Sequence, residues 1–551
     1  MCGIWAVLGT KPSYAETVGM VQNLKARGPE GTRITDVSYR ITFAFTRLAI
    51  NGLTDAGMQP YESSEISWIC NGEIYNYKEI EQSLYGDKPV ITGSDCKCIG
   101  DLYRRHRDDL ATFARSLDGV FALVIYDSVR QRIVVARDPY GIRPLYIAKK
   151  PKAISISLDT YVFASELKAL LPYYTDIKVF PPGHIQVYRT QDVSLLQDIQ
   201  YHSVPWITHP KYRPSELGGF RDSQHAIRFA LEEAVRKRMV SERPVAALLS
   251  GGLDSSLIAA LVQQNLRQLG QPPLKTFTIG FKGSSDVAHA RMVAEWIESD
   301  HTEIIMTPDE FFDAIPEVIK AIESFDTTTV RASVGNYLVA KKIRELTECK
   351  VVFNGDGADE LFGGYLYFNK APNDQAFHSE TARLLENIHQ FDVLRSDRTI
   401  SSNGLEARTP FLDKQFVAVV RSIHPELLRP VPGQQVEKYY LRAAFDDGVT
   451  LPYDVLWRRK EAFSDGVSGT EKAWFQEIQE RVTRLLVNDS WQEKSLGYLH
   501  LPPKTMEEYY YRTLFESYYG TYVCKIAVPY RWMPMWSPET TDPSARTLNI
   551  Y

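Results

Sequence analysis

The sequence has few cysteines, no long apolar run and no excess of basic residues. It has six cysteines in 551 residues, and none are spaced like a CxxC pair or a disulfide framework. This favours a reducing compartment, so we expect a cytoplasmic protein. No run approaches the roughly 20 apolar residues of a membrane span, and the N-terminus does not read as a secretory signal. The formal net charge of −5 argues against a nucleic-acid-binding surface. We expect neither a membrane nor a nucleic-acid partner.

The first third of the chain contains short apolar runs separated by turns. Segments such as Ile4 to Leu8 and Val120 to Tyr126 predict strands. Glu16 to Ala26 and Asp95 to His106 predict helices. Many strands with few helices indicate a layered α+β domain. A polar, proline-containing stretch at about residues 203–218 predicts the boundary of this domain.

The rest of the chain alternates between apolar strands and amphipathic helices. Val245 to Leu249, Phe277 to Phe281 and Lys350 to Phe353 predict buried strands. Ser255 to Leu269 predicts a helix between the first two. This β-α-β alternation predicts a parallel sheet of the α/β class.

The N-terminus carries a candidate nucleophile, Cys2. Removal of Met1 would expose an α-amino group, of reference pKa near 8, on the residue that bears the thiol. Such an amine can take the thiol proton and produce a thiolate. Asn71 and Gly72 follow a strand and can form an oxyanion hole, although Asn-Gly is also a common turn.

Two charged residues add to this candidate site. Arg47 can hold a carboxylate bidentately, and Asp95 can accept hydrogen bonds from an ammonium group. Taken singly, a surface ion pair or a helix cap is the more ordinary role for either residue.

Together these segments resemble the class II glutamine amidotransferase domain. The matching strings, in the family's order, are Met1-Cys2-Gly3-Ile4, Arg27-Gly28-Pro29, Arg47-Leu48, Asn71 to Asn76, Gly93-Ser94-Asp95, Leu117 to Ala122 and Arg137 to Tyr146. The resemblance implies a four-layer αββα N-terminal-nucleophile domain over residues 2–190 that hydrolyses glutamine. It implies that Cys2 attacks the amide and that Asn71 and Gly72 hold the oxyanion. The implied glutamine-binding residues are Arg47, Leu48, Ala49, Ile50, Asn51, Asn71, Gly72, Glu73 and Asp95. Asn51 stands where the family usually has an aliphatic residue.

The segment Ser250-Gly251-Gly252-Leu253-Asp254-Ser255-Ser256 lies between a predicted strand and a predicted helix. Its glycines allow the backbone to approach a phosphate group, and helix N-terminal amides favour anions. The serines add hydroxyl donors, and Asp254 can hold Mg²⁺. The segment lacks the Gly-Lys-Ser/Thr of a Walker loop. A lone Ser-Gly-Gly would be more typical of a turn that caps a helix.

A second cluster, residues 354–365, follows another predicted strand. Parallel sheets bind ligands beyond the carboxyl ends of their strands, so the two clusters can face each other across a nucleotide. Asp254 and Asp359 then suit Mg²⁺ with a pyrophosphate group. Alone, the acidic cluster reads equally well as a solvated loop or a calcium site, although its spacing does not match an EF-hand.

The serine-glycine loop resembles that of ATP pyrophosphatases, and residues 215–551 resemble the synthetase domain of glutamine-hydrolysing asparagine synthetases. Residues 191–214 would be the linker. The matching strings include Thr328 to Ser333, Gly364 to Pro372, Phe391 to Arg398, Pro410 to Asp413, Trp457 to Gly466 and Thr541 to Thr547. The implied ATP-binding residues are Leu249, Ser250, Gly251, Gly252, Asp254, Ser255, Ser256, Ile279, Asn354 and Gly355. Lys460 would stabilise negative charge at the reacting centre.

The chain departs from this family within the second cluster. The family usually reads Ser-Gly-Glu-Gly-Ser-Asp-Glu where this chain has residues 354–360. Asp356 therefore replaces a glutamate assigned to the acyl-adenylate half-reaction, and Ala358 removes a hydroxyl group. Because Asp is one methylene shorter than Glu, we predict a reduced but not abolished synthetase rate.

The resemblance implies a cytoplasmic ligase with ATP as co-substrate and Mg²⁺ as cofactor. It would convert L-aspartate to L-asparagine, AMP and pyrophosphate through β-aspartyl-AMP, using ammonia that Cys2 releases from L-glutamine. A homodimer is common in the family. Three alternatives remain at this stage: an amidotransferase that acts on another carboxylate, a phosphosugar amidotransferase, and a catalytically impaired regulatory protein. Cys2 argues against β-lactam synthetase-like chains, and the Ser250 to Ser256 loop argues against a phosphosugar amidotransferase.

Overall fold

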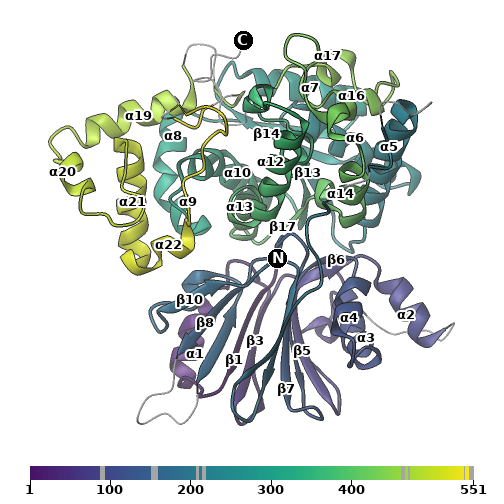
Figure 1. The fold of residues 1–551 in the computed structure, drawn as a ribbon, viewed down its shortest axis with the longest axis vertical. Helices are drawn as coiled ribbons and strands as arrows, with labels where there is room; N and C mark the ends of the chain where they lie inside the picture. Colours follow the sequence, from purple (N-terminus) through teal and green to yellow (C-terminus); the bar gives the residue numbers. More distant parts are fainter. Residues whose placement is uncertain are drawn as a thin grey trace.

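The computed structural model describes residues 1–86, 93–150, 159–206, 210–213, 219–460, 466–468, 472–538, 540 and 542–544. Parts of the matching strings at 457–466 and 541–547 lie outside these residues. Two domains are stacked along the long axis, and the N-terminus lies at their junction (Figure 1). Within the described ranges, no helix combines the length and apolar character needed to cross a membrane.

The N-terminal domain contains two six-stranded antiparallel sheets. The first has the order β10-β8-β9-β1-β3-β2 and the second β12-β11-β7-β6-β5-β4. The strands of the first sheet are β1 (Gly3–Leu8), β2 (Gly31–Ser38), β3 (Ile41–Arg47), β8 (Tyr146–Lys150), β9 (Thr160–Ala164) and β10 (Asp176–Val179). Those of the second are β4 (Tyr61–Glu62), β5 (Ile66–Ile74), β6 (Gly119–Asp127), β7 (Arg132–Arg137), β11 (His184–Arg189) and β12 (Leu195–Gln200).

The sheets pack face to face, with helices on their outer sides. Helix α1 (Tyr14–Gln22) covers the first sheet, and α3 (Cys98–Arg105) and α4 (Leu110–Ser116) cover the second, beside α2 (Tyr77–Tyr85). All six residues of β1 are buried because successive side chains enter different layers. Ile4 joins the core between the sheets, and Trp5 joins the core beneath α1. The predicted αββα architecture is confirmed.

The C-terminal domain is built on a five-stranded parallel sheet of order β15-β14-β13-β16-β17. Its strands are β13 (Val245–Leu248), β14 (Lys275–Gly280), β15 (Asp300–Ile305), β16 (Val351–Phe353) and β17 (Glu406–Arg408). The strand order reverses between β13 and β16. In open α/β sheets, such a reversal is where ligands bind.

Helices surround this sheet and extend beyond it (Figure 1). The first group is α5 (Gly219–Lys237), α6 (Leu253–Gln268), α7 (Ser285–Ile297), α8 (Pro308–Asp313), α9 (Ile315–Ile322), α10 (Thr327–Leu346), α11 (Ala358–Phe362), α12 (Asp374–Asn387) and α13 (Asp392–Ser401). The second group is α14 (Lys414–Arg421), α15 (Pro425–Leu428), α16 (Tyr439–Ala444), α17 (Tyr453–Leu456), α19 (Trp474–Leu485), α20 (Trp491–Ser495), α21 (Met506–Tyr519) and α22 (Cys524–Ala527).

The predicted linker differs from the structure in one respect. Residues 191–214 were expected to connect the domains, yet β12 within them pairs with β11 and forms an edge of the second sheet. Its residues are mostly exposed, so the polar sequence that suggested a linker also suits an edge strand.

Candidate active sites at two strand ends

The Cys2 thiol lies at the start of β1, against the main chain of Leu48. The Leu48 N–H donates to Cys2 Sγ at 3.4 Å, and Sγ lies 3.5 Å from the Leu48 carbonyl oxygen. Burial raises the pKa of the thiol to about 11. The thiol therefore needs a base to become a nucleophile at neutral pH.

Met1 carries the terminal amino group of this chain, whereas the predicted mechanism needs a terminal amine on Cys2 itself. The Met1 side chain is buried, and its amino group donates to the Leu405 carbonyl oxygen at 2.9 Å. Burial lowers the pKa of this amine to about 5. Cys2 acquires an α-amine of its own only when Met1 is removed.

The predicted oxyanion residues lie within β5. Asn71 is 1% exposed, and in the part of the chain that the structure describes neither its side-chain nitrogen nor its oxygen has a hydrogen-bond partner. A buried amide without partners is costly, so this amide is suited to bind a ligand. Gly72 allows close pairing with β6, because a Cβ there would lie 2.2 Å from the Val120 carbonyl oxygen.

Two carboxylates, Glu73 and Asp95, lie buried close to these residues. Asp95 accepts a hydrogen bond from the Ile74 N–H at 2.8 Å, and Glu73 accepts one from Asn51 Nδ2 at 2.8 Å. Burial raises the pKa of Asp95 to about 6. Burial and the charge of Asp95 raise the pKa of Glu73 well above its ordinary value. Such a pair is chemically suited to receive a cationic group.

Arg47 makes different contacts from those the sequence suggested. Its guanidinium donates to the carbonyl oxygens of Thr54, at 2.8 Å, and Gly52. In the structure it therefore holds the loop that follows β3, and its grip on a substrate carboxylate stays a prediction. The C-terminal domain also supports this loop, since the Glu242 N–H donates to the Ile50 carbonyl oxygen at 3.1 Å.

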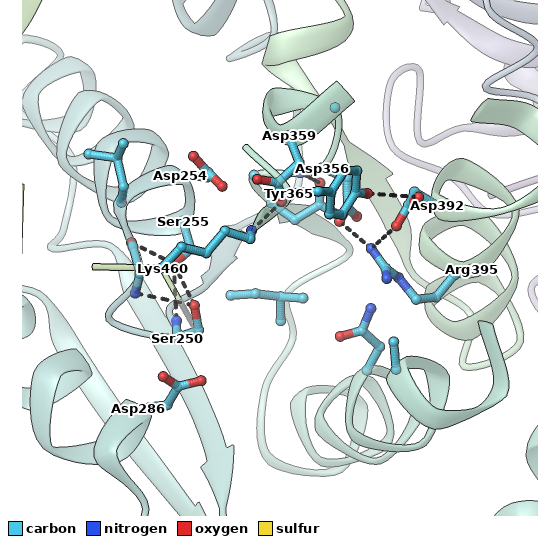
Figure 2. Close-up of a pocket in the computed structure, with 18 of the residues that line it drawn as sticks. Ser250, Asp254, Ser255, Asp286, Asp356, Asp359, Tyr365, Asp392, Arg395 and Lys460 are labelled. Atoms are coloured by element: carbon cyan, nitrogen blue, oxygen red, sulfur yellow. Dashed lines mark hydrogen bonds and ion pairs between the residues drawn. The ribbon is translucent and has the colours of Figure 1, made fainter. Parts of the chain in front are cut away.

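The second site is a pocket at the carboxyl ends of β13, β14 and β16 (Figure 2). The loop after β13 is closed by its own serines, since Ser250 Oγ and Ser255 Oγ are 3.0 Å apart. Gly251 has a positive φ of 71°, and a Cβ there would meet helix α7 at Ala290 N, 2.5 Å away. Only glycine adopts this position without strain.

Acidic and basic side chains alternate across this pocket. Lys438 forms ion pairs with Asp254 and, at 2.6 Å, with Asp359. Lys460 also forms an ion pair with Asp359 (Figure 2). Burial alone would raise the pKa of Asp359, but the two lysines offset burial and hold it below its ordinary value. Both lysines can stabilise a phosphate group at this point.

Helix α13 forms the opposite wall of the pocket. Arg395 Nη2 lies 2.8 Å from Asp356 Oδ1 and 2.9 Å from Asp392 Oδ1 (Figure 2). The same helix also holds the residue that follows β16, because Asn354 Nδ2 donates to Ser396 Oγ at 2.6 Å.

The structure brings most of the predicted ATP-binding residues together in this pocket. Those that line it are Leu249, Ser250, Gly252, Asp254, Ser255, Ile279, Asn354 and Gly355, together with Asp356, Asp359 and Lys460. Gly251 and Ser256 belong to the same Ser250 to Ser256 segment, but neither of them lines the pocket. Lys438 and Arg395 were not singled out from the sequence. Lys438 belongs to no motif, whereas Asp392 and Arg395 are spaced to share a helix face.

Comparison with known proteins covers the whole chain. Residues 1–216 match the glutamine amidotransferase domain model, and residues 226–376 and 369–543 match the asparagine synthase model. A glutamine-hydrolysing asparagine synthetase from Gallus gallus is 38% identical, covering 100% of this chain and 99% of that protein. The Homo sapiens protein of the same name is 37% identical with the same coverage. A solved glutamine phosphoribosylpyrophosphate amidotransferase from B. subtilis is 20% identical, covering 49% of this chain and 65% of that one, with a TM-score of 0.31. The identity over the full length shows that the chain belongs to the glutamine-hydrolysing asparagine synthetases.

Proposed function

We propose that the protein synthesises L-asparagine from L-aspartate, ATP and the amide nitrogen of L-glutamine. The observation that carries this proposal is the presence of two separate, chemically complementary sites in one chain. The first combines a thiol, an unpartnered amide and two buried carboxylates. The second combines a serine-glycine loop with paired lysines and aspartates.

At the first site, Cys2 attacks the side-chain amide of glutamine to form a γ-glutamyl thioester and release ammonia. The α-amine freed by removal of Met1 takes the thiol proton. The unpartnered Asn71 amide and the Gly72 N–H stabilise the oxyanion. Glu73 and Asp95 hold the substrate ammonium group, and the Arg47 to Asn51 segment lines the pocket. Water then hydrolyses the thioester to glutamate.

At the second site, the β-carboxylate of aspartate attacks the α-phosphorus of ATP, giving β-aspartyl-AMP and pyrophosphate. The Ser250 to Ser256 loop holds the phosphates, and Leu249, Ile279, Asn354 and Gly355 hold the nucleoside. Lys460 stabilises the negative charge that develops, and Asp356 serves the acyl-adenylate half-reaction. Ammonia from the first site crosses the domain junction and displaces AMP.

The acidic residues of this pocket suit a magnesium ion. Asp254 and Asp359 are close enough for one lysine to contact both, and Asp254 Oδ1 has no hydrogen-bond partner among the described residues. Mg²⁺ prefers one or two carboxylates together with phosphate oxygens. When bound, it would neutralise charge on the phosphates.

The remaining assignments are proposals of the same kind. We assign residues 2–190 to the glutaminase domain, to which β12 adds an edge strand, and 215–551 to the synthetase domain, with the rest of 191–214 between them. The absence of disulfides among the six cysteines supports a reducing cytoplasm. We also propose a homodimer.

The experiment that tests the proposal separates the two nitrogen sources. The Cys2→Ala variant is expected to lose glutamine-dependent asparagine formation by at least about a thousandfold. With free ammonia it should retain the wild-type rate, because the synthetase pocket is intact. Cys524→Ala, which alters a buried thiol on α22, is the matched control. Glutamine-dependent synthesis by Cys2→Ala would contradict the proposal.

A further inference from the structure

The last strand of the parallel sheet brings an arginine of the C-terminal domain to the glutamine pocket. Arg408, in β17, is 1% exposed. Its Nη1 donates to the carbonyl oxygens of Arg238 and, at 2.6 Å, Val240, and its Nε donates to Glu406 Oε1 at 3.0 Å. These contacts fix the plane of the guanidinium group.

The remaining nitrogen of this guanidinium points across the domain junction. Arg408 Nη2 lies 3.5 Å from Glu73 Oε2, and it makes no hydrogen bond within the described ranges. Asn51 Nδ2 donates to the same Glu73 oxygen at 2.8 Å. Both contacts are to Oε2, and Glu73 Oε1 takes part in neither. Glu73 Oε2 is thus held by the Arg408 guanidinium of the C-terminal domain and by the Asn51 amide of the N-terminal domain.

We propose that Arg408 is a positioning residue for glutamine: it orients the Glu73 carboxylate beside a fixed positive charge, so that the substrate α-ammonium can bind it. The glutamine pocket is then complete only when the synthetase domain is docked on it. This inference rests on the proposed function, specifically on glutamine as the ligand of the first site.

The electrostatic need for Arg408 follows from what surrounds Glu73. Burial favours the neutral acid and raises the pKa of Glu73, and the nearby charges of Asp95 and Glu406 raise it further. Arg408 and Arg143 oppose this rise. Loss of the Arg408 charge would raise the pKa of Glu73 further and disfavour its charged form, and a neutral carboxyl group does not form an ion pair with an ammonium group.

The other titratable groups near Glu73 come from several elements. They are Cys2 at the start of β1, Tyr77 in α2, and Asp95 and Cys96 at the turn before α3. Asp95 is the one with a pKa raised to about 6. An acid limb of the glutaminase rate therefore reports Glu73 and Asp95 as a coupled pair, together with the Cys2 α-amine, which must be neutral to take the thiol proton.

The test measures ammonia release by Arg408→Gln with two substrates. For glutamine, we expect KM to rise about tenfold or more with kcat changed less than about threefold, because Cys2 and Asn71 are untouched. For glutaramate, which has the amide but no α-ammonium group, we expect kcat/KM to stay near the wild-type value. A merely structural role would weaken both substrates equally, and that result would overturn the proposal.

The pH profile supplies a second readout. Removing a positive charge raises the Glu73 pKa, so the acid limb of kcat/KM for glutamine should move to higher pH in Arg408→Gln. Arg408→Lys keeps the charge without the rigid fork and should give an intermediate profile. An acid limb that stays at the wild-type pH in both variants would overturn the proposal.

A double-mutant cycle with Glu73→Gln identifies the route of the effect. If Arg408 acts through Glu73, adding Arg408→Gln to Glu73→Gln should change KM less than twofold. Additive losses would overturn the proposal. Ammonia-dependent asparagine synthesis, measured in each variant, reports whether the synthetase pocket is intact. Wild-type protein that releases no glutamate would overturn the proposed function itself, whereas an active wild type with unaltered variants would overturn the role of Arg408 alone.

Discussion

Asp356 is the residue at which this chain departs most clearly from its family's pattern. In the structure its Oδ1 is held by Arg395 at 2.8 Å, on the side of the pocket away from Asp254 (Figure 2). Its carboxyl group is one methylene shorter than the usual glutamate. A carboxyl group on this shorter side chain lies further from the reacting acyl centre and interacts with it less well.

We therefore predict that Asp356→Glu raises the rate of asparagine formation, by about tenfold to a hundredfold. The rate is measured with ATP, aspartate and free ammonia, so that the glutaminase site does not contribute. Glutamate release from glutamine is the internal control and should not change. An unchanged or lower synthesis rate would show that Asp is the better residue in this pocket.

Individual residues also mark the limit of what the sequence predicts. The nucleophile, the oxyanion amide and the serine-glycine loop lie in contiguous motifs. The structure places Cys2 just before β1 and the serine-glycine loop directly after β13, whereas Asn71, which was expected to follow a strand, lies within β5. Lys438 and Arg408 lie in no such motif. Their importance comes from contacts with residues far away in the sequence, such as Asp254 for Lys438, 184 positions away, and Glu73 for Arg408.

At the scale of elements, the loops after β13 and β16 form one unit. A Cβ on Gly355 would lie 2.8 Å from the Asp254 carbonyl carbon and from Ser255 N. The two strand ends thus touch through a glycine, and this contact sets the distance between the phosphate loop and the acidic cluster.

We predict that Gly355→Ala separates these loops and raises KM for ATP by about tenfold or more, since backbone atoms cannot yield as a flexible side chain can. Glutaminase activity should be unchanged. Gly19→Ala, on helix α1, where a Cβ would make only an ordinary van der Waals contact with Tyr173 Oη at 3.9 Å, is the control. An unaltered KM for ATP in Gly355→Ala would mean that the loops do not need this contact.

The elements themselves were only partly predictable. Apolar runs such as those of β1, β6, β13 and β14 identified strands, because both faces of each are covered. The mostly exposed β12 and the three-residue β17 carry no comparable pattern. Strand order is also absent from local sequence, because it depends on which distant segments pair. The sequence therefore predicted a ligand site at the carboxyl ends of the parallel strands, but not its place where the strand order reverses between β13 and β16.

At the scale of the whole molecule, the two domains share a buried, charged junction. Arg27 donates to Asp397 of α13 at 2.7 Å, to Glu166 at 2.9 Å, and to the Cys2 carbonyl oxygen at 2.9 Å. Arg398, the next residue of α13, pairs with Glu323. The same helix carries Arg395 in the synthetase pocket, so α13 lines one site and reaches the main chain of Cys2 in the other through Arg27.

We predict that Asp397→Asn lowers the free energy of unfolding by about 3 kcal/mol, because it leaves part of a buried positive charge uncompensated. The midpoint of urea unfolding measures this loss. Asp309→Asn removes a partner of Arg481 at a largely exposed position and should change stability by less than about 0.5 kcal/mol. Equal midpoints for the two variants would show that the junction does not depend on this pair.

The central claim is that nitrogen passes from one site of this chain to the other. The most direct measurement supplies amide-¹⁵N-glutamine, ATP, Mg²⁺ and aspartate to the purified protein and follows asparagine, AMP and glutamate together. The account predicts ¹⁵N-labelled asparagine in step with AMP, with glutamate at least equal to both. Glutamate released without AMP or asparagine would contradict it, and would leave a glutaminase whose second site serves another purpose.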